Sequence, residues 1–180
     1  GEAFISTTNH DSGTDRVQEY AKTAGLEAQE VVINVQGDEP LIDIEAVNQL
    51  GDFMHANKYK YGTIAQHFSS NTDLLDPNKV KVVLNDDNSA TEFFRDAPIV
   101  VKDFSKVVLH HVGIYAYQVD FLHTFAGLSK TKNELNLKLE QMRALDNALP
   151  LHVLELNLDE SWGIDTEEDL IRLRKHLELN

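Results

Sequence analysis

A run of β-branched residues that stops at a turn limits the folds open to this chain. Residues 31–35 read Val-Val-Ile-Asn-Val and are followed at 36–40 by Gln-Gly-Asp-Glu-Pro. A short apolar run bounded by turn residues is typical of a buried strand. Apolar residues recur at helical spacing before it, over 14–25, and after it, over 44–54, and a short strand is expected at 62–65. Helix and strand therefore alternate, which favours an α/β layer architecture with some parallel pairing.

The middle of the chain has a different pattern. Residues 80–84 and 90–94 are strand-like and flank the turn-forming tetrad Asn-Asp-Asp-Asn at 85–88, which predicts an antiparallel hairpin. We further expect a strand at 110–117, helices at 121–125 and 134–145, a strand at 151–156, and a last helix capped by Thr166 and Asp169. No repeat or linker divides the chain, so the sequence predicts one domain over residues 1–180.

Composition argues against several classes of protein. The 180 residues carry 16 Lys and Arg against 30 Asp and Glu, a formal charge of −14, and contain no cysteine. So strong a negative charge repels phosphate backbones, which argues against a nucleic-acid partner. The lack of cysteine excludes thiolate nucleophiles, thiolate zinc sites and disulfides. No window approaches the ~20 apolar residues that span a bilayer, so we expect no membrane partner and a cytoplasmic location.

Two aspartates stand in loops that follow strand-like segments. Asp38 lies in the Gln-Gly-Asp-Glu-Pro string, and Asp165 lies in the string Ser-Trp-Gly-Ile-Asp-Thr at 161–166, just before a helix. Ligands of open α/β sheets bind beyond the carboxyl ends of strands, and Mg²⁺ is bound by one or two carboxylates plus substrate phosphates. Each aspartate alone could instead cap a turn or a helix. As a pair they predict a Mg²⁺ site.

Two further strings could line a binding pocket. His110, His111 and Tyr115 stand near Gly113 on one strand-like segment, but adjacent histidines of a strand face opposite ways, which disfavours zinc. These residues could line a sugar pocket or serve as hydrogen-bonded core residues. The string His-Asp-Ser-Gly-Thr-Asp-Arg at 10–16 opens a helix and could bind an anion or act only as a cap. The sequence contains no nucleophile elbow, dinucleotide-binding loop or Walker loop.

Taken in order, the strings resemble the 3-deoxy-manno-octulosonate cytidylyltransferase (CMP-KDO synthetase) family. The matching strings are those at 10–16, 32–40, 77–84, 111–115, 139–143 and 163–170, so the likeness runs over essentially the whole chain. The resemblance implies a nucleotide-diphospho-sugar transferase fold of Rossmann-like type, with a mixed, mostly parallel sheet flanked by helices. It also implies a homodimer formed through the antiparallel region around 78–118.

The same resemblance implies a reaction. The anomeric hydroxyl of the eight-carbon acid sugar attacks the α-phosphorus of CTP and pyrophosphate leaves, with Mg²⁺ as cofactor, in lipopolysaccharide synthesis. The catalytic positions are Asp38, Asp165 and Arg95, and the two aspartates are also the metal positions. The sugar-binding positions are Gln36, Arg95, His111, Tyr115, Glu134 and Gln141, and the nucleotide-binding positions are His10, Ser12, Gly13 and Gly37. Arg95 suits the sugar carboxylate because a guanidinium binds it through two parallel hydrogen bonds.

Departures from the family pattern leave alternatives open. The family's basic opening segment, of the type Pro-Ala-Arg-x-x-Ser-x-Arg-Leu-Pro-Gly-Lys, binds the CTP phosphates and has no counterpart in these 180 residues. We therefore expect an N-terminally truncated fold that is inactive by itself. Thr7, Asn9, Phe94 and Leu137 also replace usual residues. The sugar could be the ordinary octulosonate, an 8-amino analogue or another acid sugar such as sialic acid. A non-catalytic oligomerisation or binding module is the alternative from another class.

Overall fold

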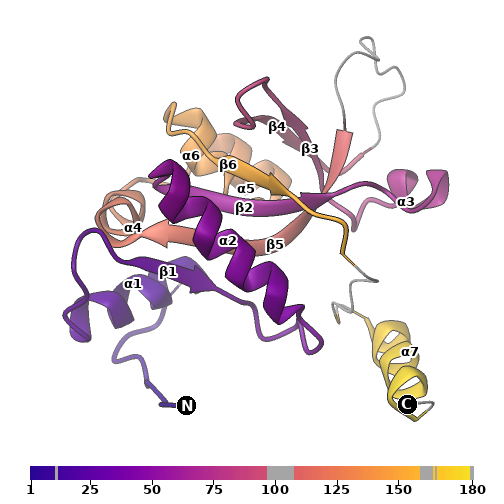
Figure 1. The fold of residues 1–180 in the computed structure, drawn as a ribbon, viewed down its shortest axis with the longest axis horizontal. Coiled ribbons are helices and arrows are strands. Elements are labelled where there is room, and N and C mark those ends of the chain that lie inside the picture. The colour runs from indigo at the N-terminus through magenta and orange to yellow at the C-terminus, as the bar shows by residue number, and fades with distance from the viewer. Residues whose placement is uncertain (11, 97–107, 159–163, 165, 179–180) are drawn as a thin grey trace.

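A computed structural model describes residues 1–10, 12–96, 108–158, 164 and 166–178 (Figure 1). Its elements are α1 (Gly13–Thr23), β1 (Val31–Asn34), α2 (Ile44–Asn57), β2 (Tyr61–Gln66), α3 (Asn71–Leu75), β3 (Lys81–Leu84), β4 (Ala90–Phe94), β5 (Val108–Gln118), α4 (Val119–Ala126), α5 (Lys132–Leu137), α6 (Met142–Asp146), β6 (His152–Glu155) and α7 (Glu167–Glu178). The expected alternation of helix and strand in the first third is confirmed, and so is the hairpin, which is formed by β3 and β4.

One expected helix is absent as a single element. The helix predicted over 134–145 is wrong, because the structure has the two short helices α5 and α6 in its place. Lys138 ends α5 with a φ of 54°, in the left-handed region, where a residue stops a right-handed helix. The chain turns there, and α6 begins at Met142.

The strands form one six-stranded sheet in the order β4-β3-β5-β2-β6, with β1 also paired to β5. The expectation of mostly parallel pairing is wrong, since among the described strands only β2 and β6 pair in parallel. The reason is the position of β5. The strands β1, β2, β3 and β6 share one direction, as helix–strand alternation favours, but β5 runs the opposite way and lies between them. The mixed α/β architecture itself is confirmed.

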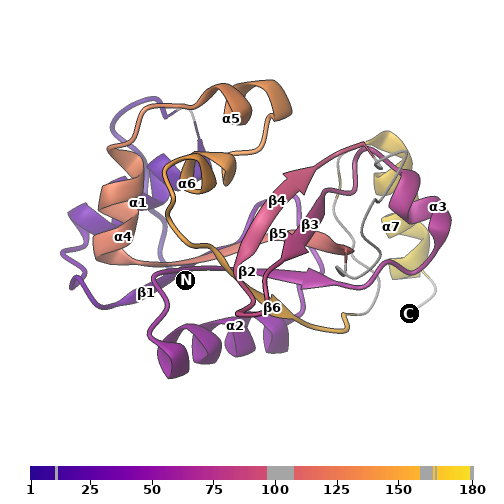
Figure 2. The ribbon, with the colours of Figure 1, turned by 90° about the horizontal axis from the view of Figure 1, so that it is seen from above.

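Helices cover both faces of the sheet (Figure 2). Helix α2 lies on one face, where Leu50 and Met54 pack on Ile64 of β2 and Ile114 of β5. Helices α1, α4, α5 and α6 lie on the other face, over an aromatic core that includes Tyr61, Tyr117, Phe121 and Phe125. None of the helices in the described ranges is both long and apolar enough to cross a membrane.

Candidate functional site

The sheet divides along one edge of its central strand, β5. On that edge β5 pairs with β3 through residues 108–110 and with β1 through residues 115–118, so no described strand pairs with residues 112–114 there. On its other edge the register with β2 shifts at the same level, where Thr63 lies opposite Tyr115 but Ile64 lies opposite Val112. Ligands of open α/β sheets bind in the crevice where neighbouring strands diverge. The division therefore marks the candidate site.

Polar side chains from four parts of the chain meet beside this division. Tyr115 of β5 lies opposite Asn34 of β1, and its hydroxyl donates to Gln141 Oε1 at 3.1 Å. The start of α1 also lies here, since a Cβ on Gly13 would be 3.3 Å from Gln36 Nε2 and 3.6 Å from Asn34 Nδ2. The structure thus brings the predicted residues Gly13, Gln36, Tyr115 and Gln141 into one neighbourhood.

Two amide groups in this neighbourhood are buried donors without a hydrogen-bond acceptor among the described residues. They are Nδ2 of Asn34, a residue that is 8% exposed, and Nε2 of Gln141, a residue that is 2% exposed. A buried donor left unsatisfied costs about 1–3 kcal/mol, so an acceptor supplied by a ligand would stabilise the site. Asn34 was not among the residues predicted from the sequence. The sequence feature that could have identified Asn34 is its place as the one polar residue in an otherwise β-branched run.

His111 belongs to the same strand and is held as a neutral ring. The Thr63 hydroxyl donates to Ile114 O at 2.8 Å and lies 3.1 Å from His111 Nε2. Since the hydroxyl's only proton goes to a carbonyl, Nε2–H of His111 is the donor and Nδ1 carries the lone pair. Burial lowers the pKa of His111 to about 3 and that of His110 to about 4. His111 can therefore orient a ligand through hydrogen bonds but is not charged near neutral pH.

We predict that His111 stays neutral at pH 5, because its pKa in the folded chain is about 3, against 6.5 for an unperturbed histidine. As the pH falls from about 6.5 towards 3, the unfolded chain takes up this proton first, so His111 lowers the stability of the fold over that window. An NMR titration of the imidazole nitrogens should be flat above about pH 4.5. A ring that titrates between pH 6 and 7 would contradict this environment. In His111→Gln the free energy of unfolding should fall less than in the parent chain as the pH drops from about 6.5 towards 3.

The Gln-Gly-Asp-Glu-Pro loop lies next to the C-terminal part of the chain. Glu39 N–H donates to Gln36 O at 3.2 Å, closing the expected turn, and the Asp38 and Gly37 residues are exposed. Ile164 N–H donates to the carbonyl oxygen of Asp38 at 3.0 Å. Asp165 lies outside the described residues, but the backbone just before it reaches Asp38. The helix cap expected after it is confirmed, because Thr166 and Asp169 bond reciprocally.

This donor set fits a hard divalent cation. The described residues contain no group of three or more His, Asp or Glu side chains that could cage a metal ion. Mg²⁺ does not need such a cage, since it keeps several waters and takes one or two carboxylates plus substrate phosphates. The exposed Asp38 carboxylate suits that kind of partial site, and the metal-binding roles of Asp38 and Asp165 remain predictions.

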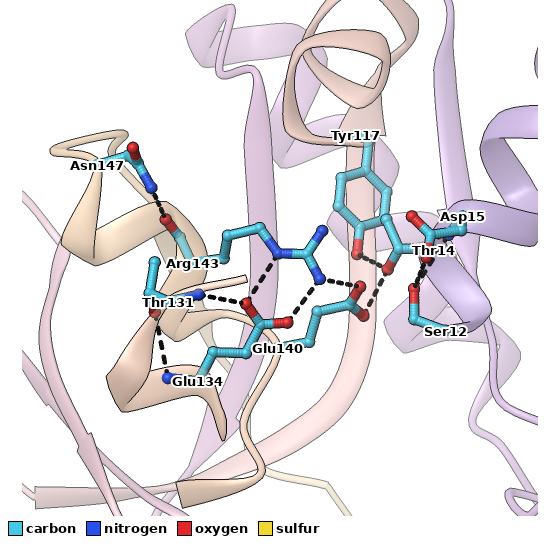
Figure 3. A network of polar contacts seen from close by, with 9 residues as sticks. All are labelled: Ser12, Thr14, Asp15, Tyr117, Thr131, Glu134, Glu140, Arg143 and Asn147. Carbon is cyan, nitrogen blue, oxygen red and sulfur yellow. Dashed lines mark hydrogen bonds and ion pairs between the residues drawn. The ribbon is translucent and has the colours of Figure 1, made fainter. Parts of the chain in front are cut away.

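Glu134, a predicted sugar contact, lies inside a buried polar network (Figure 3). Glu134 is 6% exposed, and its carboxylate accepts from Arg143 Nε at 2.9 Å and from Arg143 Nη2 at 2.5 Å. Arg143 Nη2 also lies 3.5 Å from Glu140, and Glu140 accepts from Thr14 Oγ1 at 2.8 Å. Tyr117 OH completes the chain 3.1 Å from Thr14. The network ties α5 and α6 to the start of α1, and the role of Glu134 towards a sugar stays a prediction.

Among the described residues, the hydrogen-bond partners of Arg95 are backbone carbonyls. Its Nε donates to Leu137 O at 3.0 Å and its Nη2 to Lys138 O at 3.4 Å, at the C-terminus of α5, where a cation is favoured. The fully buried Lys81 fixes the backbone beneath it, since Lys81 Nζ donates to Arg95 O at 2.7 Å and to Asp76 O at 2.6 Å. Burial lowers the pKa of Lys81. The catalytic and carboxylate-binding roles of Arg95 remain predictions.

Two of the predicted nucleotide-binding residues have local partners. Ser12 caps α1, accepting from Asp15 N at 3.2 Å. His10 contacts Glu19 through Nε2, and this contact together with Thr7 lowers the pKa of Glu19 to about 2. Both residues precede or open α1, whose N-terminal turn carries backbone N–H groups without helical partners. Their contact with a nucleotide stays a prediction.

Comparison with known proteins places this geometry in a family. The family model described as "Cytidylyltransferase" matches residues 1–154. The chain is 40% identical to the 3-deoxy-manno-octulosonate cytidylyltransferase of Trichlorobacter lovleyi, over 98% of this chain and 74% of the relative, and 37% identical to that of Neisseria meningitidis serogroup A, over 96% and 72%. The solved structure of CMP:2-keto-3-deoxy-manno-octonic acid synthetase complexed with CTP matches with a TM-score of 0.84 at 31% identity, over 95% of this chain and 70% of that one. The match of the family model over most of the chain, with this identity to its relatives, shows that the chain belongs to the cytidylyltransferase family.

Proposed function

We propose that this chain works as a 3-deoxy-manno-octulosonate cytidylyltransferase, which transfers CMP from CTP to the acid sugar for lipopolysaccharide synthesis. The observation that carries the proposal is the division of the sheet beside β5, where Asn34 and Gln141 present buried donors that find no acceptor in the described part of the chain. A polyhydroxylated acid supplies the oxygen acceptors that such donors need. The relatives named for this reaction are 34–40% identical to the chain over the aligned residues, and each of the two alignments that set this range covers 98% of the chain.

In the proposed reaction the anomeric oxygen of the sugar forms a bond to the α-phosphorus of CTP. The bond from that phosphorus to the bridging oxygen breaks, pyrophosphate leaves, and the hydroxyl proton is released. Asp38 and Asp165 would hold Mg²⁺, which when bound offsets the charge at the reacting phosphate. Gln36, Tyr115 and Gln141 orient the sugar, and the Ser12–Gly13 start of α1 faces the nucleotide. Catalysis then rests on positioning and electrostatics.

Pyrophosphate release tests this proposal directly. The assay uses these 180 residues preceded by the family's basic phosphate-binding segment, because the 180 residues are expected to be inactive by themselves, and this extended chain is the parent chain in every activity assay below. With CTP and Mg²⁺ we expect the octulosonate to be used with a kcat/KM at least about 10-fold above that of sialic acid, because a pocket that bonds specific hydroxyl groups rejects a sugar that places them differently. The 8-amino analogue is assayed in parallel, and the octulosonate with the higher kcat/KM is identified as the substrate. EDTA should abolish the signal. Binding of the sugars without pyrophosphate release from any of them would favour the non-catalytic binding module.

We also propose that the protein is a homodimer that forms through the antiparallel region around 78–118. In the described part of this region, β4 is an edge strand, and Thr91 and Glu92 on it are exposed. An unpaired strand edge offers backbone groups to a second strand. Sedimentation velocity should give a species of twice 20.3 kDa, and a monodisperse monomer would contradict the proposal. We propose the cytoplasm as its location, in keeping with CTP as substrate.

A further inference from the structure

Neither its backbone φ nor close packing requires a glycine at Gly113, which lies where the register of β5 with β2 shifts. It lies in the interior of β5, where glycine weakens a strand, and its φ is outside the left-handed region that requires one. A Cβ built on Gly113 would meet no atom within 4 Å. Gly62 on β2 differs, since a Cβ there would lie 2.5 Å from Met54 Sδ, so close helix packing explains that glycine. The space beside Gly113 is open, and nothing in the described fold fills it.

The open space beside Gly113 lies in the candidate site. Gly113 falls between the stretch of β5 that pairs with β3 and the stretch that pairs with β1, where the sheet divides. His111 and Tyr115 stand two residues away on either side, and their rings are 5.4 Å apart between centroids. A strand glycine often marks a β-bulge, which the register shift with β2 gives here, or the close approach of a ligand to the backbone, which the open space allows.

We propose that Gly113 is a specificity-determining residue, whose bare backbone forms the floor of the sugar site and against which the acid sugar lies. This inference rests on the proposed function and adds to it the part of the site that limits the size and fit of the sugar. His111 and Tyr115 supply polar atoms at the two ends of the floor, while Gly113 supplies room. A side chain at position 113 would occupy that room without disturbing the core.

Graded substitutions at this position test the inference. Gly113→Ala and Gly113→Val should fold as well as the parent chain or better, because both restrict the unfolded chain and valine favours strands. The KM for the sugar should rise about 10-fold with alanine and about 100-fold with valine, as expected when one or more methyl groups intrude on a fitted substrate. The KM for CTP should change less than about 3-fold. Melting temperature and pyrophosphate release measure both effects.

Gly127→Ala is the matched control, because Gly127 is an exposed right-handed residue at the end of α4, away from the division of the sheet. Both KM values should stay at the parent level in this variant. Parent-like sugar KM values in a folded Gly113→Val variant would overturn the inference while leaving the proposed function intact. Should valine impair folding, parent-like values in Gly113→Ala would overturn it equally. A parent chain that neither binds the sugar nor releases pyrophosphate would overturn the proposed function and this inference together.

Discussion

Asp38→Asn is expected to lower kcat for pyrophosphate release by at least about 100-fold while leaving the fold unchanged. The amide keeps the shape of the side chain but removes the charge that would hold a divalent cation next to the reacting phosphate. Loss of one such electrostatic group typically costs a factor of about 10²–10³. Asp38 is exposed in its loop, so the melting temperature should not move. Assays over a range of Mg²⁺ concentrations measure the effect.

The control for this variant is the same chemical change elsewhere. Asp86 is also an exposed aspartate, in the turn between β3 and β4, and Asp86→Asn should keep the parent kcat and the parent dependence on Mg²⁺. If Asp38→Asn behaved like Asp86→Asn, the loop would serve only as a turn, which is the alternative interpretation of its acidic residues.

Arg143→Met is expected to lower the free energy of unfolding by about 3–5 kcal/mol. Arg143 is 2% exposed and is paired with Glu134 and Glu140, and its guanidinium lies 4.7 Å from the centroid of the Phe125 ring. Its removal leaves a buried carboxylate without a cation, and that charge costs more than the ion pair contributes. Urea unfolding should show the loss, with a fall in melting temperature on the order of 10 °C.

Lys60→Met is the control for Arg143→Met, because it removes an exposed ion pair instead of a buried one. Lys60 bonds Asp120 at 2.8 Å, but its side chain is 59% exposed, and such pairs contribute about 0–1 kcal/mol. The double variant Arg143→Met with Glu134→Gln should recover part of the lost stability, because the amide of glutamine leaves no unpaired charge in the core. Equal losses for Arg143→Met and Lys60→Met would show that the network of Figure 3 is not a buried ion pair in solution.

Much of the fold could be predicted because its signals are local. The β-branched run of β1, the turn tetrad between β3 and β4, and the cap at Thr166 each depend on residues within a few positions of one another. The insertion of β5 between β1 and β2 could not be predicted this way, since strand order depends on contacts between distant segments. The break at Lys138 was equally hidden, because a left-handed lysine has no compositional signal of the kind glycine gives.

The residues of the candidate site also fall into those that local sequence patterns predict and those that they do not. Gln36, Tyr115 and Gln141 were predicted by their strings, and the structure brings the ends of their segments together. Asn34 was missed because a polar residue in a strand is more often read as a core hydrogen-bonding group. The partner of Glu134 was missed because Arg143 stands nine residues away, across the break between α5 and α6. Such pairings are properties of packing rather than of sequence patterns.

The central claim is that Asp38 and Asp165 hold one divalent ion between them. Mn²⁺ binding in the presence of CTP, followed by electron paramagnetic resonance, tests it in the parent chain, in Asp38→Asn, in Asp165→Asn and in the double variant. If the two aspartates share one ion, each single substitution should weaken Mn²⁺ binding to the level of free CTP, and the double variant should lose nothing further. Parent-level Mn²⁺ affinity in either single variant, or losses that add in the double variant, would contradict a shared ion.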